Sequence, residues 1–140
     1  MIYVVVIDCE FRFEEVAELL NVCWMEARNG FDCRKLSANT EYRVLFFIKF
    51  GERPHGWNAL PIKFSIKTPD GEEMETEHIL AAIGLPINSD RWMEVVAGEF
   101  IVKAAYEDSS IIEFCMKEVQ SNFWKRGLLI QGVKIEPKYT

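Results

Sequence analysis

Apolar and polar residues alternate along several stretches of the chain, and a period of two is typical of β-strands with one buried face. Residues 62–68 show this alternation and lead into Pro69, Asp70 and Gly71, which favour a tight turn. Other stretches are more continuously apolar and rich in β-branched and aromatic residues, which indicates more deeply buried strands. The predicted strands are residues 2–8, 41–50, 62–68, 91–96, 100–106, 111–119 and 128–135.

Two further stretches fit either a helix or a strand. In residues 14–29 apolar side chains recur at helical spacing and Asn29 and Gly30 would cap the helix, yet the same two residues would also form a turn after a strand. Residues 72–83 begin with an acidic cluster that suits a helix N-terminus, or they return as the second strand of a hairpin. Because the strands outnumber these stretches, the sequence predicts a mainly β fold, an antiparallel β-sandwich with one or two short helices. The alternative is an α+β fold.

The length of 140 residues suits one globular domain, residues 1–140. Within it, we expect residues 1–119 to form the sandwich core and residues 120–140 to form a C-terminal extension with a last strand. Gly98 and the polar residues 107–110 are predicted turns, and residues 51–59 form a loop by composition. The formal net charge of −6 argues against nucleic-acid binding by the whole surface.

The first residues are apolar but lack the basic segment of a signal peptide, so they indicate a buried strand. Nor does any apolar run approach the roughly 20 residues that span a membrane. We therefore expect a cytoplasmic protein that does not enter a membrane. The four cysteines have apolar neighbours, and in the cytoplasm they are expected to remain free buried thiols.

Four segments follow one another in a recognisable order: residues 6–10, 45–50, 64–71 and 98–102. This order resembles that of a family of small uncharacterised bacterial proteins of unknown function, over roughly residues 1–119. The resemblance implies an immunoglobulin-like β-sandwich and implies no activity. The chain departs from the pattern in its acidic cluster at 72–77 and in the segment that follows Val119.

The predicted loop at residues 51–59 is one candidate binding site. It brings together a cation, Arg53, an imidazole, His55, and an indole, Trp57. Loops held by a rigid scaffold often carry binding residues, and here Trp57 would stack on a ligand while Arg53 contacts an anion. The alternative is an ordinary connection in which Trp57 packs into the core.

A second candidate surface is the basic aromatic segment 122–127. Its residues Phe123, Trp124, Lys125 and Arg126 combine two aromatic rings with two cations. Such a combination suits a protein-binding hot spot, or stacking and phosphate contacts on a single-stranded nucleic acid. Alternatively, Phe123 and Trp124 cap the sandwich core.

No stretch of the sequence has the pattern of a catalytic site. It contains no nucleophile elbow and no glycine-rich phosphate loop, and Asp8, Cys9 and Glu10 have no histidine that sequence places beside them. A helix at 72–83 would bring Glu75 beside His78, but further metal ligands at suitable spacing are missing. We therefore expect no enzyme, cofactor or metal, but a non-enzymatic interaction module that binds a protein partner or self-associates. The alternatives are a small-ligand-binding domain that uses residues 51–59 and, less favoured, a nucleic-acid-associated factor.

Overall fold

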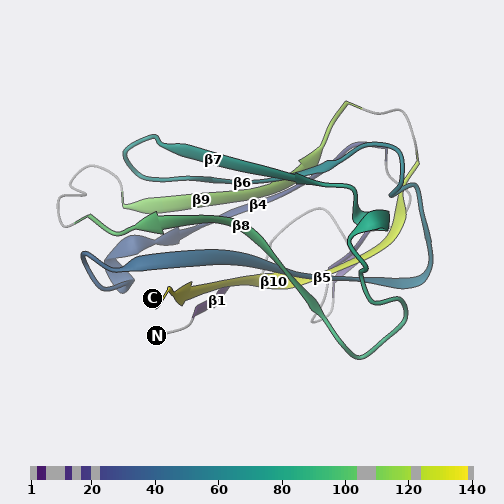
Figure 1. Ribbon diagram of the computed structural model, residues 1–140, viewed down its shortest axis with the longest axis horizontal. Coiled ribbons are helices and arrows are strands. Elements are labelled where there is room, and N and C mark those ends of the chain that lie inside the picture. The colour runs from purple at the N-terminus through teal and green to yellow at the C-terminus, as the bar shows by residue number, and fades with distance from the viewer. Residues whose placement is uncertain are drawn as a thin grey trace.

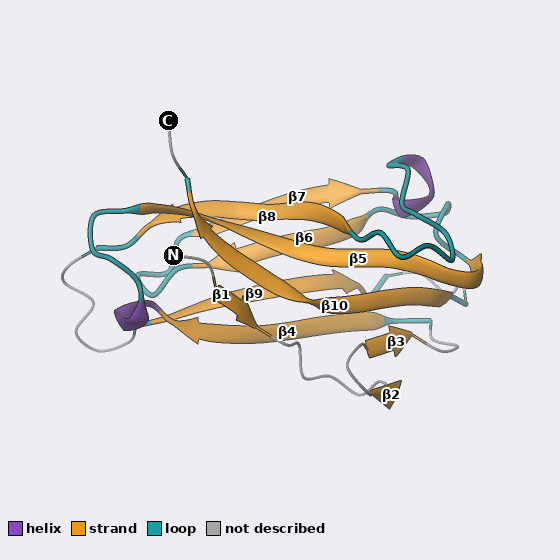
Figure 2. Ribbon diagram, turned by 90° about the horizontal axis from the view of Figure 1, so that it is seen from below, coloured by secondary structure: helices purple, strands orange, loops and turns teal. Residues whose placement is uncertain are grey.

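The computed structural model describes residues 3–5, 12–13, 17–19, 23–103, 110–120 and 124–138. In it two antiparallel β-sheets lie face to face as a sandwich (Figure 1). The strands are β1 (Tyr3–Val5), β2 (Arg12–Phe13), β3 (Ala17–Leu19), β4 (Met25–Asp32), β5 (Glu41–His55), β6 (Ile62–Lys67), β7 (Glu73–His78), β8 (Met93–Ile101), β9 (Ile111–Glu118) and β10 (Arg126–Pro137). Two 3₁₀ turns, η1 (Cys33–Lys35) and η2 (Leu80–Ala82), lie at opposite ends of the sandwich (Figure 2). The described residues contain no α-helix, and neither 3₁₀ turn has the length and apolarity to cross a membrane.

Strand β10 lies in the middle of the larger sheet. The order of that sheet is β2-β3-β10-β5-β8, and β1 pairs with β10 on the same side as β3 (Figure 2). The smaller sheet has the order β4-β9-β6-β7. The last strand predicted at residues 128–135 is therefore present, is longer than predicted, and is an internal part of the sheet.

The core is made by the inward residues of both sheets, as the alternation in the sequence requires. Along β5 the buried residues that face the smaller sheet are Tyr42, Val44, Phe46, Ile48 and Phe50, all at most 5% exposed. The ring of Phe46 crosses between the sheets, with edge-on contacts to Phe64 of β6 at 5.5 Å and Phe114 of β9 at 6.2 Å between centroids. These aromatic contacts add to the area that each ring buries and fix the sheets face to face.

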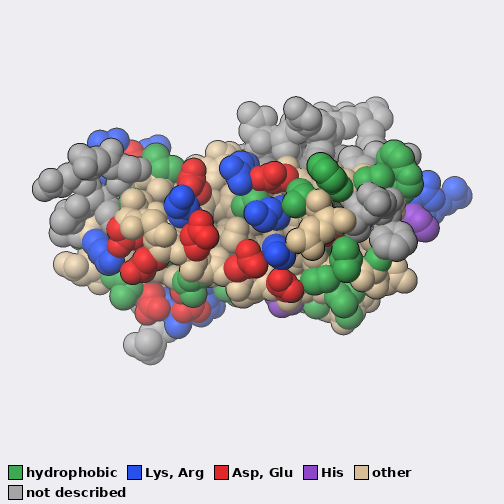
Figure 3. All heavy atoms as spheres, turned by 90° about the horizontal axis from the view of Figure 1, so that it is seen from above, with side chains coloured by type: hydrophobic (Ala, Val, Ile, Leu, Met, Phe, Trp, Pro, Cys, Tyr) green, Lys and Arg blue, Asp and Glu red, His purple; other side chains and the backbone are tan. Residues whose placement is uncertain are grey.

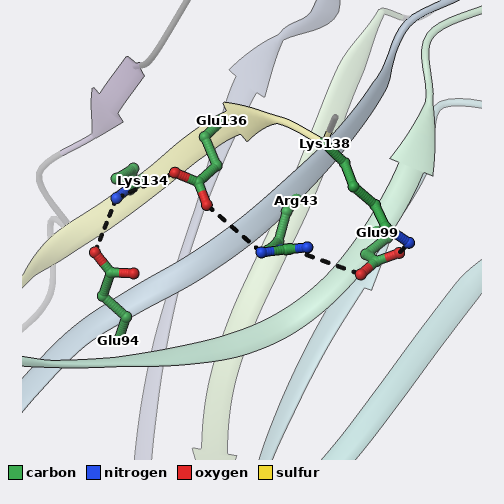
Figure 4. Close-up of polar contacts among 6 residues, drawn as sticks. All are labelled: Arg43, Glu94, Glu99, Lys134, Glu136 and Lys138. Carbon is green, nitrogen blue, oxygen red and sulfur yellow. Dashed lines mark hydrogen bonds and ion pairs between the residues drawn. The ribbon is translucent and has the colours of Figure 1, made fainter. Parts of the chain in front are cut away.

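The outer face of the larger sheet carries a network of ion pairs (Figure 4). Its members are Arg43, Glu94, Glu99, Lys134, Glu136 and Lys138. Lys134 Nζ lies 2.8 Å from Glu94 Oε1 and 3.1 Å from Glu136 Oε2. Lys138 donates to Glu99 at 2.6 Å, and this hydrogen bond lowers the pKa of the Glu99 carboxyl. Each exposed pair adds little stability, but together they leave this face with its charges largely matched.

Residues 17–19 and 25–29 form strands, which excludes the helix that was one of the two alternatives for residues 14–29. The turn predicted at Asn29 and Gly30 is wrong, because β4 continues through both to Asp32 and pairs with β9 along its whole length. The ladder to β9 supplies the backbone hydrogen bonds that a helix cap would otherwise provide. Residues 14–16 and 20–22 lie outside the described residues.

Residues 73–78 are the return strand of a hairpin, which confirms one of the two predictions for that segment and excludes the helix. Gly71 adopts a φ of +90° and closes the turn after β6. Strand β7 then pairs with β6 from Glu73 opposite Lys67 to His78 opposite Ile62. Since Glu75 and His78 are an odd number of residues apart on a strand, they point to opposite faces and form no metal-binding pair.

Gly98 lies where the two sheets approach each other closely, and the turn predicted there is wrong. Strand β8 runs through it from Met93 to Ile101, with a register shift against β5. A Cβ atom at position 98 would lie 2.8 Å from the side chain of Ile66 in the facing sheet. The glycine is therefore needed for the packing of the two sheets rather than for a turn. Residues 104–109, which include most of the polar turn predicted at 107–110, lie outside the described residues.

Candidate functional site

One end of the sandwich contains a cleft of about 670 Å³. It lies where β5 ends, η2 follows the smaller sheet and β10 begins, at the right-hand end of Figure 1. The loop predicted at residues 51–59 is only partly a loop, because β5 extends to His55 and pairs there with Arg126 of β10. The irregular segment begins at Gly56 and forms one wall of the cleft.

Trp57 forms the inner wall of the cleft and is only 3% exposed. Its indole Nε1 donates a hydrogen bond to the carbonyl of Arg126 at 2.8 Å. Its ring packs against Phe50 of β5, with centroids 6.1 Å apart. The structure therefore places Trp57 in the core, where its indole N–H is satisfied by a carbonyl of β10 and its ring also lines the cleft.

The rim of the cleft is formed by exposed side chains from three distant parts of the chain. Trp124 and Ile87 are each 60% exposed and supply an apolar surface. His55 and Asn58 are also exposed, and their side chains offer hydrogen-bond donors and acceptors. Figure 3 shows hydrophobic side chains gathered toward this end of the molecule. The site thus combines an apolar wall with a few polar groups, which is usual for ligand sites.

Two glycines allow the backbones on either side of the cleft to touch. Gly56 has a φ of +88°, and a Cβ atom there would lie 2.1 Å from the carbonyl oxygen of Trp124. Gly127 has a φ of +83°, and a Cβ atom there would lie 2.8 Å from Cα of Pro54. Only glycine meets both the left-handed φ and the close approach. The end of β5 and the start of β10 are thereby held against each other, with Trp124 beside them.

A buried ion pair lies next to the cleft. Lys125 is 2% exposed, and its Nζ lies 2.7 Å from Oε1 of Glu118, which is 4% exposed. Lys125 also donates to the carbonyl of Cys23, while Glu118 accepts from the backbone N–H of Gln120 at 2.6 Å. The pair therefore ties the start of β10 to the end of β9 and to the segment before β4.

The structure joins two surfaces that the sequence predicted separately. His55 and Trp57 from residues 51–59 line the same cleft as Trp124 from residues 122–127. Arg53 is exposed with a φ of +53°, and it does not line the cleft. Ile87 had no signal in the sequence, because it reaches the site only through a backbone bridge to Phe50.

The basic aromatic segment is not the continuous cationic surface that its sequence indicated. Lys125 points into the protein toward Glu118, so its ammonium group is not presented to a phosphate. Arg126 and Trp124 are exposed on either side of it. Phe123 lies outside the described residues, as do Asp8, Cys9 and Glu10.

The described residues that line the cleft provide groups for binding. Among its described lining residues, His55 is the single titratable side chain, and no serine or cysteine lies beside it to act as a nucleophile. Among all described residues, no group of three or more His, Cys, Asp and Glu side chains is arranged to hold a metal. The fold and the cleft together define a binding module built on a β-sandwich.

Comparison with known proteins identifies the family. The profile of the phloem protein 2 family matches residues 3–137, and the chain belongs to this family. The bacterial family that the segment order resembled is therefore the wrong assignment. The segments behind it, a turn after an alternating strand and a glycine before an aromatic residue, recur in many antiparallel sheets.

Relatives from Arabidopsis thaliana include Protein PHLOEM PROTEIN 2-LIKE A2, 36% identical over 89% of this chain and 61% of its own length. Another, Putative F-box protein PP2-B2, is 30% identical over 91% of this chain and 44% of its own length. The chain thus spans about half the length of these curated relatives. Among solved structures, the Podospora anserina GH26-CBM35 β-(1,4)-mannanase aligns with a TM-score of 0.44 at 8% identity, over 100% of this chain and 28% of that one.

Proposed function

We propose that this domain is a lectin-like module that binds carbohydrate in the cleft between residues 55–58 and Trp124. Membership of the phloem protein 2 family, a lectin-like family, supports the class of ligand. The proposal takes up the alternative of a small-ligand-binding domain rather than the protein-binding module that the sequence favoured.

The exposed indole of Trp124 is the observation that carries the proposal. A sugar ring has a face of C–H groups and a rim of hydroxyls, so it fits an aromatic surface that is flanked by hydrogen-bonding groups. Trp124 is 60% exposed and offers such a surface, while His55 and Asn58 line the same cleft and offer hydrogen-bonding groups to hydroxyls. The glycine contacts and the buried ion pair fix the backbone beside Trp124, which reduces the entropy lost on binding.

An experiment on two equally exposed tryptophans tests the site. Trp124→Ala and Trp24→Ala remove indoles that are 60% and 63% exposed, but Trp24 does not line the cleft. We expect the Trp124 variant to lose at least about tenfold in binding to an oligosaccharide array, because a stacked indole is a typical hot spot. The Trp24 variant should bind within about twofold of the wild type.

Both substitutions are at the surface, so both variants should unfold within about 1 kcal/mol of the wild type. Equal thermal stability would show that a loss of binding comes from the cleft. Retention of full glycan binding by Trp124→Ala would refute the site. Binding of a protein partner, with no glycan bound by the wild type, would favour the interaction module instead.

A further inference from the structure

The outer face of the smaller sheet contains a groove that is separate from the cleft. Two hollows of about 440 and 360 Å³ lie along β9, and Lys117 lines both. The larger is bordered by β4, β6 and β7, and the smaller continues toward Leu60 and Val119. Among the described residues, none lines both a hollow and the cleft. Figure 3 views the molecule from the side of β6 and β7, and acidic and basic side chains are intermixed on that face.

Small residues in neighbouring strands make the floor of the larger hollow. Ser65 of β6 lies directly opposite Cys115 of β9, and Gly30 of β4 lies opposite Glu113 of β9. These three small residues stand among longer charged side chains at the outward positions around them, including Arg28 and Lys67. A depression with charged walls results in the middle of the sheet.

Two lysines face each other across this groove. Lys63 of β6 is the direct cross-strand partner of Lys117 of β9. Like charges at directly opposite positions repel, so this pair costs stability rather than adding to it. Lys63 is partly compensated by Glu75 at 3.8 Å and Glu77 at 3.9 Å.

Lys117 is less well compensated. Its cross-strand partner on the other side is Glu26 of β4, but the Glu26 carboxylate lies 2.7 Å from the guanidinium of Arg28. Within the described part of the chain, no carboxylate lies within 4 Å of the ammonium group of Lys117, and the same holds for Lys67 further along the groove. The larger sheet provides the contrast, because on its outer face Lys134 and Lys138 are both paired closely with glutamates. The groove thus holds a half-buried cationic position at Lys117 that an external anion would neutralise.

We propose that this groove is a second binding site, which takes an anionic saccharide and seats its acidic group between Lys63 and Lys117. The inference that the ligand is anionic comes from the lysine pair. The inference that the anionic group belongs to a saccharide rests on the proposed function. A carboxylate and a sulfate ester share this chemistry. The hollows follow β9 from Ile111 to Val119, which at about 3.3 Å per residue is roughly 26 Å and suits a linear oligosaccharide. The glutamates of β7 would accept hydrogen bonds from its hydroxyls.

The test compares three probes on the full chain: an oligogalacturonide of about five sugars, its methyl-esterified neutral form and a sulfated oligosaccharide. Titration calorimetry at low salt should show that one or both acidic probes bind, and that the neutral ester binds at least about fivefold more weakly. Acidic binding should also weaken as salt is added, because exposed charges are screened. The acidic probe that binds more tightly identifies the anion.

Three variants locate the site. Lys117→Gln should weaken binding of the acidic probe about five- to tenfold, and Glu75→Gln should strengthen it about twofold by releasing Lys63. Lys35→Gln changes the net charge equally but lies at η1, outside the groove, and should leave binding within about 1.5-fold. Equal weakening by Lys117→Gln and Lys35→Gln would overturn the proposal, as would equal affinity for the acidic and neutral probes.

Trp124→Ala separates this inference from the proposed function. If the groove is independent, that variant binds the acidic probe normally whether or not it has lost other glycans. Acidic binding that depends on Trp124 and is unchanged in Lys117→Gln would place the anion in the cleft and refute the second site. If no glycan of the array binds but binding of the acidic probe still requires Lys117, the cleft proposal is refuted and the groove proposal is supported.

Discussion

The buried pair of Lys125 and Glu118 should behave differently from every exposed ion pair described in this protein. The two charged groups lie 2.7 Å apart and are 2% and 4% exposed. At an effective dielectric constant of about 20, their gross attraction is about 6 kcal/mol. Desolvation of both ions cancels most of that attraction, so the intact pair contributes little net stability.

Removal of one partner is a different perturbation, because it leaves the other charge buried and uncompensated. Lys125→Met or Glu118→Gln alone should therefore lower the free energy of unfolding by about 3–5 kcal/mol. For a chain of this length the unfolding entropy is about 0.3 kcal/mol/K, so the melting temperature should fall by roughly 10–17 °C. The double variant keeps an acceptor for the N–H of Gln120 and should cost only about 1–2 kcal/mol.

Urea unfolding of the two single variants and the double variant gives the coupling energy directly, provided that the slopes with urea concentration agree. Lys138→Met is the matched control, because Lys138 lies 2.6 Å from Glu99 but both side chains are 30% exposed. That control should cost less than about 1 kcal/mol. Single variants of Lys125 and Glu118 that cost no more than the control, with additive effects in the double variant, would refute the reasoning.

Two further predictions concern a glycine and a carboxylate. Gly56→Ala should destabilise the protein by at least about 3 kcal/mol, because the new Cβ atom would clash with the carbonyl of Trp124. Gly71 has a similar φ but open space around it, so Gly71→Ala should cost only about 1 kcal/mol. Similar chemical-denaturation midpoints for the two variants would contradict this. Hydrogen bonds, chiefly from Lys103, lower the pKa of Asp70 from 3.8 to about 2, so its contribution to stability is complete above pH 3.8 and is lost as the pH falls toward 2. Asp70→Asn should flatten the fall in stability across that interval, and an unchanged pH profile would count against the contact.

Much of the sandwich could be predicted because its central strands have one apolar face. The period of two in β6 and the dense apolar run in β5 follow directly from burial on one or two sides. Strand β7 was ambiguous for the opposite reason. All but one of its residues are exposed, and its inward positions hold Met74, Thr76 and His78, so no apolar face marks it as a strand. Pairing with β6, a tertiary contact, decides its structure.

The site could be predicted only in halves. Residues 51–59 and 122–127 were both identified, but the contact between Trp57 and Arg126 joins positions 69 residues apart, which composition does not encode. The burial of Lys125 was missed for a local reason. Leu128 points into the core, so regular strand alternation would also point Arg126 inward. The register shift between Arg126 and Leu128 breaks this alternation, and Lys125 points inward instead.

The central place of β10 has a consequence for the protein during its synthesis. Strand β5 has two neighbours, β8 and β10, and β10 is the last strand of the described chain. At about 5–20 residues per second, the ribosome adds residues 56–137 in roughly 4–16 s. Throughout that interval the fifteen-residue strand β5 has at least one edge with unpaired backbone groups, next to apolar side chains that the finished sheet covers. The nascent chain therefore passes through a period in which its longest strand is open to aggregation or to capture by a chaperone.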